Sequence, residues 1–372
     1  MNAPPRPLRF LFIALAGLSL LSGVWIGVAR LGFALPLPSP AMIALHGPLM
    51  AIGFLLTLIG LERTTAVDRW WVYGVPLLGV ITVFWLILGL PQKMAAFFAV
   101  FAAALLILFF YQLFRLRREE HSVVMSLSAA LLFCGNLLWA LDSAIFQVVP
   151  WWAGFLVVMI AGERLELTRL RRLPLWVRVP LRVALLLFVA GLALTIVDFR
   201  LGVRIAGAGL IAIALWLMRY DRAWQSVKLP GLPRFMALCL ICGYFWLALG
   251  GVFWIWFARF FGAGPLYDAA LHTVFIGFIF SMIFAHAPII LPTITGLTLP
   301  FHDSFYLHAG LLHISLLVRV AGNLAFLPDG QKLGGLLNAL AILLFLINNL
   351  RAVVSGRSGW RAKLGSGTIA QL

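Results

Sequence analysis

The stretch DAALHTVFIGFIFSMIFAHAP, residues 268–288, is apolar and carries a histidine near each end, His272 and His286. Five of the seven histidines in the chain lie between positions 272 and 313. Histidine within a membrane span is costly unless it has a partner, so it points to a functional site. Because neutral imidazole is a common ligand of haem iron and of copper, this stretch predicts a membrane haem protein.

The composition of the chain favours a lipid environment. Of its 372 residues, 63% are hydrophobic and 11% are charged, and the mean hydropathy is +1.05. An ordinary soluble domain is only about half apolar. A net charge of +16 would suggest nucleic acid in a soluble protein, but here the basic residues lie in short loops between apolar runs, as topology signals do. We therefore expect a lipid bilayer around the chain and no nucleic-acid partner.

Apolar runs of about 20 residues, the length that crosses a bilayer as an α-helix, recur throughout. They predict an all-α polytopic membrane bundle that forms one integral membrane domain over residues 1–372. The expected spans, about twelve, cover approximately residues 10–31, 42–61, 71–90, 94–114, 122–147, 149–167, 179–198, 202–218, 235–258, 267–290, 305–326 and 333–352. The first run is too long for a signal peptide and lacks its cleavage site, so we interpret it as a retained span. A tight turn around Pro150 is expected between spans five and six.

The basic residues also predict an orientation. With the N-terminus in the cytoplasm, 21 Lys and Arg residues lie in inner segments, six in outer segments, and Arg319 within a span. The outer six are Arg30, Lys93, Arg200, Arg204, Arg259 and Lys332. This excess on the inner side favours an N-in, C-in topology.

Orientation gives each histidine a depth. Spans two and ten both run from outside to inside, so His46 and His272 are expected about one turn below the outer surface. Two imidazoles at matched depth on two helices would hold one haem iron from both faces. The alternative is that each imidazole satisfies a backbone carbonyl within the bundle.

A second group of histidines is expected in the inner half. His286 lies 14 residues beyond His272, which is about 21 Å along an α-helix and about 40° around it. His308 and His313 begin span eleven at a similar depth, and His302 lies in the preceding loop. These residues predict a second haem or a metal ion, copper included; hydrogen bonding within the bundle is the alternative.

Neighbouring residues fit either a cofactor or helix packing. Arg319 lies in the outer half of span eleven, where its guanidinium would pair with a haem propionate or, alternatively, with Asp142 or Asp268. Gly47 and Gly277 would let a flat ring approach the backbone, or let helices pack closely.

Two blocks of the chain resemble the NnrS family. The first is His46-Gly-Pro-Leu-Met-Ala-Ile-Gly-Phe-Leu-Leu-Thr57, and the second runs from His272 through His286-Ala-Pro-Ile-Ile-Leu-Pro-Thr-Ile-Thr-Gly296. NnrS-like proteins are twelve-span haem and copper membrane proteins associated with bacterial nitric oxide stress. The resemblance implies a b-type haem, a multi-pass location in the bacterial inner membrane, and a role in nitric oxide handling or membrane electron transfer. Electron transfer would require a redox partner protein or a quinol.

The chain is more distantly similar to subunit I of haem-copper oxidases and nitric oxide reductases. That fold also has twelve spans and holds a low-spin haem by histidines on spans two and ten, the spans that contain His46 and His272. Its catalytic centre also requires histidines on spans six and seven and a second histidine two residues from the span-ten ligand. Here spans six to nine lack histidine and position 274 is Val274, so proton-pumping oxygen reduction is not expected.

Three function classes therefore remain open. A haem protein, including an oxidoreductase acting on nitric oxide or a related small species, is the first. Intramembrane His, Arg and Asp would also suit a proton-coupled transporter. A cofactor-free membrane assembly subunit is the third, and a Soret band in the visible spectrum separates the first class from the other two.

We predict that reporter fusions after residues 120 and 357 will report the cytoplasm and that a fusion at Gly264 will report the outside. The reason is that loops rich in Lys and Arg remain on the cytoplasmic side. Paired alkaline phosphatase and fluorescent protein fusions measure each location. A cytoplasmic signal at Gly264 would overturn the depths assigned to the histidines.

Overall fold

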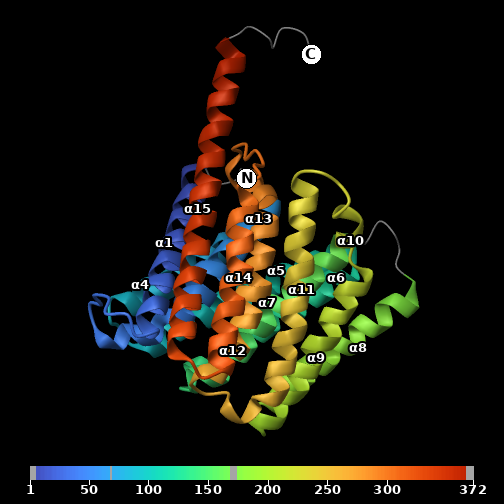
Figure 1. Cartoon of the computed structure of the whole chain (residues 1–372). Helices are drawn as coiled ribbons and strands as arrows, with labels where there is room; N and C mark the ends of the chain where they lie inside the picture. The colour runs from blue at the N-terminus through green and yellow to red at the C-terminus, as the bar shows by residue number, and fades with distance from the viewer. Residues whose placement is uncertain (1–5, 68, 168–173, 366–372) are drawn as a thin grey trace.

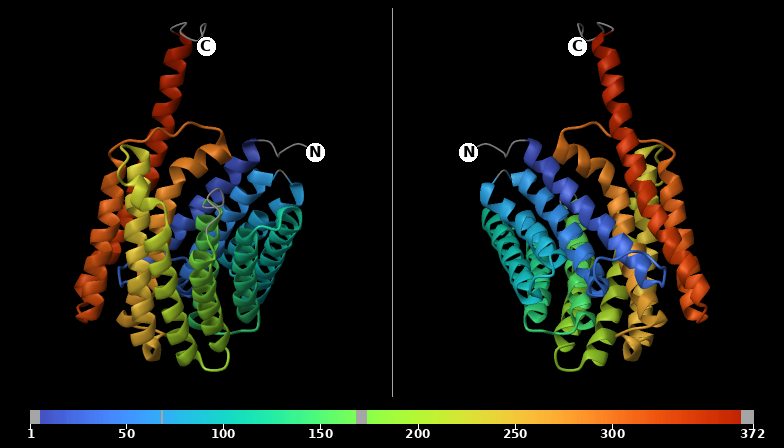
Figure 2. Two further views of the ribbon diagram at one scale, coloured as in Figure 1. Left: turned by 90° about the vertical axis from the view of Figure 1, so that its right-hand side faces the viewer. Right: turned by 90° about the vertical axis from the view of Figure 1, so that its left-hand side faces the viewer.

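The computed structural model describes residues 6–67, 69–167 and 174–365. This described part is helical and contains no strand. Twelve of its segments are long and apolar enough to cross a membrane. They lie side by side, and both termini are at the same end of the bundle (Figure 1; Figure 2). The prediction of an all-α, multi-pass membrane bundle with about twelve spans is therefore confirmed.

Nine of the spans within the described residues are single helices. They are α1 (Arg6–Arg30), α5 (Gln92–Arg117), α6 (Glu120–Ala140), α7 (Ile145–Leu167), α8 (Leu175–Leu194), α9 (Phe199–Tyr220), α11 (Leu232–Trp256), α14 (Phe305–Leu324) and α15 (Pro328–Gly365). The third span, Trp70–Ile87, begins with the short 3-10 helix η3 (Trp70–Tyr73) and continues as α4 (Gly74–Ile87). Two short turns of helix, α10 (Ala223–Ser226) and η5 (Ala258–Phe260), lie outside the spans.

Spans two and ten are interrupted. Span two consists of η1 (Pro40–Leu45), α2 (His46–Pro48), η2 (Leu49–Leu56) and α3 (Thr57–Val67). Span ten consists of α12 (Pro265–His272), η6 (Thr273–Phe280) and α13 (Ser281–Thr295). Both η2 and η6 are π-helices of eight residues. Because π-helical turns are rare and occur often at functional sites, these two spans are the ones to examine for function.

Two boundaries differ from the sequence-based prediction. The chain reverses between spans five and six at Asp142, whose φ is 64°, and Pro150 lies inside α7 and not in the turn. Span ten continues past residue 290, through Pro292, and ends at Gly296 with a φ of 69°. Proline removes one backbone donor without ending a membrane helix, because packed neighbours satisfy the groups that it frees.

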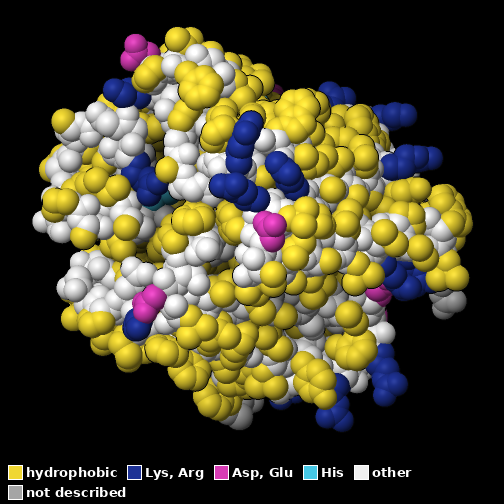
Figure 3. Space-filling model, turned by 90° about the horizontal axis from the view of Figure 1, so that it is seen from below, with side chains coloured by type: hydrophobic (Ala, Val, Ile, Leu, Met, Phe, Trp, Pro, Cys, Tyr) yellow, Lys and Arg dark blue, Asp and Glu magenta, His cyan; other side chains and the backbone are white. Residues whose placement is uncertain are grey.

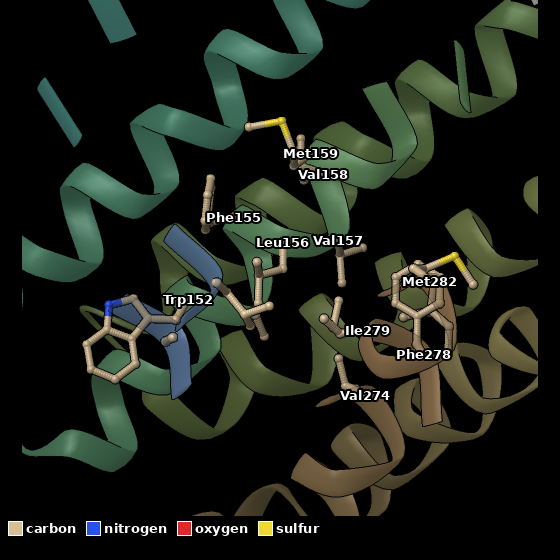
Figure 4. Close-up of a cluster of buried hydrophobic side chains, with 14 of the residues drawn as sticks. Trp152, Phe155, Leu156, Val157, Val158, Met159, Val274, Phe278, Ile279 and Met282 are labelled. Carbon is tan, nitrogen blue, oxygen red and sulfur yellow. The ribbon is translucent and has the colours of Figure 1, made fainter. Parts of the chain in front are cut away.

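Helix α7 forms the centre of the bundle. Of its 18 most apolar consecutive residues, 83% are buried, compared with 33–61% for the same stretch in the other spans. Figure 4 shows Leu156 and Val157 of α7 close to Ile279 and Val274 of span ten. This buried layer joins the central helix to one of the two interrupted spans.

Glycines let three neighbouring helices approach to backbone contact. A Cβ atom on Gly191 of α8 would lie 2.2 Å from the backbone nitrogen of Ala206 in α9. Gly207 of α9 and Gly251 of α11 face each other, and a Cβ on either would lie 2.6 Å from the carbonyl oxygen of the other. Small residues are the usual means of close helix packing in lipid, where association depends on van der Waals contact.

The surface has the features of a membrane-embedded protein. Exposed tryptophans lie near both ends of the bundle, with Trp25 and Trp256 far from the termini and Trp70, Trp176 and Trp224 near them. Tryptophan is enriched at membrane–water interfaces. The end far from the termini also carries the six basic residues assigned to the outside, and Figure 3 shows scattered basic side chains on its mainly hydrophobic surface.

Replacing Gly191 by alanine should destabilise the protein by about 1–3 kcal/mol, because the new methyl group overpacks against backbone that cannot rotate away. The matched control is Gly310→Ala on α14, where a Cβ meets no atom within 4 Å. Thermal unfolding in detergent, followed by tryptophan fluorescence, measures both variants. Equal melting temperatures would show that the α8–α9 contact is not tight.

Candidate cofactor site

The structure brings His46 and His272 together across the two interrupted spans. Their ring centroids are 6.5 Å apart and the ring planes are inclined by 32°. Both imidazoles line a cavity of about 400 Å³. Because ligand pockets in proteins occupy about 300–1,000 Å³, the cavity suits a molecule and not only an ion.

The hydrogen bonds of the two imidazoles determine which nitrogen is available. His46 Nδ1 lies 2.8 Å from the carbonyl oxygen of Gly23, and His272 Nδ1 lies 2.8 Å from that of Asp268. A carbonyl oxygen only accepts, so each Nδ1 carries the proton and donates. In both rings Nε2 therefore keeps its lone pair, as in metal-bound histidines. In His272 this lone pair accepts from Arg319 NH2 at 3.3 Å, a contact that a bound metal would displace.

The distance between the ring centroids matches the distance expected for two imidazoles that bind one metal ion between them. With metal–nitrogen bonds of about 2.0–2.1 Å, and each ring centre about 1.2 Å behind its nitrogen, two ligating imidazoles have centres roughly 6.4 Å apart. The observed 6.5 Å is in this range. The pair therefore has the spacing and the tautomers that axial ligation of one metal requires.

The cavity is apolar in its depth and polar at its mouth. Met50, Leu55, Trp152, Phe275 and Phe280 are among its apolar lining residues. Loop residues 262–264 place the mouth at the end far from the termini, the face that Figure 3 shows with a hollow on its left side. This polarity fits haem, an apolar macrocycle that carries two carboxylates.

Two arginines border the mouth but differ in their partners. Arg319 donates to both carboxylate oxygens of Asp268, at 2.8 and 2.7 Å. Asp268 is thus its partner, and Asp142 pairs instead with Lys93. Arg30 is exposed, and its NH1 donates to the carbonyl oxygen of Ile43 at 3.2 Å. Arg30 is therefore the better partner for a ligand carboxylate, and sequence reasoning did not single it out.

Asp268 anchors His272 to span eleven. Its carboxylate also accepts from Asn323 Nδ2 at 2.7 Å and lies 3.2 Å from His272 Nδ1. Arg319 NH2 reaches within 3.3 Å of His272 Nε2. The guanidinium of Arg319 is held by the carboxylate of Asp268, and Asp268 in turn contacts Nδ1 of His272. Arg319 therefore orients the imidazole of His272 through Asp268.

The two π-helices share a short motif that sequence reasoning missed. Ile52-Gly53-Phe54 in η2 is followed by Thr57, and Ile276-Gly277-Phe278 in η6 is followed by Ser281 at the same spacing. Phe54 stacks on Phe280 at 6.2 Å between ring centroids. The recurrence of Ile-Gly-Phe-x-x-Thr/Ser after His46 and His272 was the available signal that these spans are a structural pair.

The glycines near the site have separate roles. A Cβ on Gly53 would lie 2.4 Å from Val83, and one on Gly277 would lie 2.5 Å from Trp246, so both serve helix packing. Gly47 lines the cavity. Gly27 on α1 makes room for the imidazole of His46, because a Cβ there would lie 2.9 Å from its Cε1 atom.

The inner histidines have partners that differ from one another. His286 donates from Nδ1 to the carbonyl oxygen of Met282, and its Nε2 accepts from Arg164 of α7. Because η6 interrupts the α-helical repeat between His272 and His286, the angle of about 40° expected for a continuous α-helix does not apply. His286 accordingly contacts the central helix at the far end of the bundle from the cavity.

His308 and His313 are likewise engaged with protein groups. His308 is fully buried and accepts from Asn348 at 3.0 Å, whereas His313 accepts from the indole of Trp246 at 3.1 Å. His302 is exposed in its loop. Among the described residues, no group of three or more His, Cys, Asp or Glu side chains is placed to hold a metal ion. A second haem or copper centre stays a prediction.

An ionic network closes the end near the termini. Adjacent residues of α7 contact the two interrupted spans, because Glu163 pairs with Arg63 of α3 and Arg164 with His286 of α13. His121 is buried, and its Nε2 lies 3.2 Å from a carboxylate oxygen of Glu119 and 3.9 Å from one of Glu166. The loop-lined mouth of the cavity is thus at one end of the bundle, and charged side chains join the helices at the other.

The fold and the site define a multi-pass helical membrane protein with a paired-histidine cavity. The chain belongs to the family described as a domain of unknown function (DUF8744), whose model matches residues 9–354. No curated protein matches the chain. No solved structure matches it either.

Replacing Arg319 by methionine should destabilise the protein by about 3–5 kcal/mol, because Asp268, whose side chain is only 16% exposed, is left charged without its main partner. The double variant Asp268→Asn with Arg319→Met should recover part of this loss. Lys93→Met is the control, since the Lys93–Asp142 pair is about 60% exposed and should contribute at most about 1 kcal/mol. Thermal unfolding in detergent measures all three; equal losses for Arg319→Met and Lys93→Met would contradict a buried structural pair.

Proposed function

We propose that this protein is a haem-binding membrane protein in which His46 and His272 are the axial ligands of one b-type haem. The observation that supports it most is the 6.5 Å separation of two imidazoles whose Nδ1 atoms both donate to backbone carbonyls. Haem bound there supplies one-electron chemistry and affinity for small gases.

The residues of the chain divide the binding task. His46 and His272 would supply the ligating nitrogens, and the apolar walls near Trp152 and Phe275 would exclude water from the macrocycle. Arg30 at the mouth would receive a propionate, because a guanidinium recognises a carboxylate through two parallel hydrogen bonds.

The resemblance to the NnrS family suggests what such a haem protein would do in the cell. It supports nitric oxide handling or membrane electron transfer in the bacterial inner membrane, with an oxidase-like arrangement of spans and an N-in, C-in orientation. In that orientation the cavity opens to the outside, so a redox partner protein would approach from there, whereas a quinol would arrive through the lipid.

A second candidate function is proton-coupled transport. It is favoured by a cavity that opens at one end while an ionic network through Arg63, Glu163 and Arg164 closes the other. Interrupted spans around a central binding site are typical of transporters. This candidate requires solute binding in the cavity of protein that lacks haem.

The purified protein, expressed with haem supplied, should show a Soret band and the spectrum of six-coordinate low-spin iron, with one iron per chain. Replacing His46 or His272 by alanine should remove the low-spin spectrum, because each variant lacks one ligating nitrogen. Absorption spectroscopy with pyridine haemochrome and metal analysis measures the cofactor.

His121→Ala is the matched control, because His121 is a buried imidazole that does not line the cavity. A wild-type protein without a Soret band would refute the haem proposal and favour the transporter. Metal without haem would indicate a bare ion between the imidazoles, and full low-spin haem in both single variants would place the ligands elsewhere.

A further inference from the structure

The two imidazoles of the pair are held very differently, and from this asymmetry we infer that His46 is the ligand that dissociates while His272 stays. The site would then open to a small neutral diatomic ligand on the His46 side. This inference rests on the proposed haem site and assigns separate roles to its two histidines.

His272 is held by a charged network on rigid helix. It is the last residue of α12, where the three preceding residues, 269–271, are buried. Its Nδ1 lies near both the carbonyl oxygen and the carboxylate of Asp268, which Arg319 and Asn323 hold from α14. Charge-assisted hydrogen bonds are roughly twice as strong as neutral ones, so moving this ring would disrupt the strongest polar contacts of the site.

His46 is held by far less. Its Nδ1 donates to the carbonyl oxygen of Gly23 within α1, and among the described residues no ion pair or side-chain hydrogen bond adds to this neutral bond. The preceding segment, η1, contains no buried residue. Segments with few buried contacts open locally at the lowest cost in free energy. The ring of His46 therefore lies at the loosely packed start of its span, whereas His272 ends a helical turn whose preceding residues are buried.

The surroundings of His46 indicate what would take its place. The cavity wall on this side includes Val24, Gly47 and Met50, and Trp152 packs 3.5 Å from the position of a Cβ on Gly47. The indole nitrogen of Trp152 already donates to Asn136. Arg30 also lines the cavity, but in the proposed site a propionate would occupy it, so an incoming ligand would meet mainly apolar contacts beside His46. Such contacts favour an uncharged molecule of two atoms over an anion.

The test compares two alanine variants of the haem-loaded protein. His46→Ala should retain haem in a five-coordinate form that binds carbon monoxide fully after reduction, and added imidazole should restore the low-spin spectrum. His272→Ala should lose most of its haem, because the remaining imidazole is held by one neutral bond. Haem content, absorption spectra and carbon monoxide titration are the measurements.

A second pair of variants perturbs His46 without removing it. Gly27→Ala crowds its ring, whereas Gly17→Ala, on the same helix, places a Cβ where no atom lies within 4 Å. Gly27→Ala should keep its haem and increase the fraction that binds carbon monoxide at limiting gas by about tenfold, the shift expected from losing a contact of hydrogen-bond strength. Gly17→Ala should match the wild type.

Several outcomes would overturn the inference. One is that His272→Ala retains haem while His46→Ala loses it. Another is that both alanine variants lose haem equally. A third is that Gly27→Ala loses as much haem as His272→Ala. In each of these cases the wild type still carries haem, so the proposed function survives. A wild type without haem would refute the proposed function and this inference together.

Discussion

Lipid offers no hydrogen bonds, so every polar group inside the bundle must find its partner within the protein. Most intramembrane polar side chains of the described residues obey this constraint in pairs, such as Asp268 with Arg319 and His286 with Arg164. At the cavity beside His46, the Nε2 lone pair of that imidazole and the exposed guanidinium of Arg30 border open space. Polar groups that face a cavity are available to a ligand, so a ligand is expected there.

The sequence was informative about properties that follow from position along the chain, namely the number of spans and the depth of a residue in the membrane. Span number follows from hydropathy, and the matched depth of His46 and His272 follows from the direction of their spans, so the meeting of the two rings at 6.5 Å agrees with simple counting. Counting residues cannot decide whether His46 and His272 bind a ligand or only stabilise the fold. The answer depends on which nitrogen donates, and that is a property of the folded backbone around Gly23 and Asp268.

What the sequence did not reveal depends on contacts between distant spans. Asp142 and Asp268 were equal candidates for Arg319, and only the packing of α12 against α14 separates them. The π-helices change the angular phase of both interrupted spans, which is why His286 contacts α7. Hydropathy carries no information on helix type, since a π-helix in lipid has the same apolar composition as an α-helix.

The pairing of spans two and ten also has a consequence for biosynthesis. The chain must be extended from position 46 to position 272 before the second imidazole exists, which takes roughly 10–45 s at about 5–20 residues per second. During that interval His46 is in the membrane with its backbone partner on α1 but without its counterpart. The cavity is therefore a late product of translation, and any molecule that occupies it must arrive after most of the bundle has been inserted.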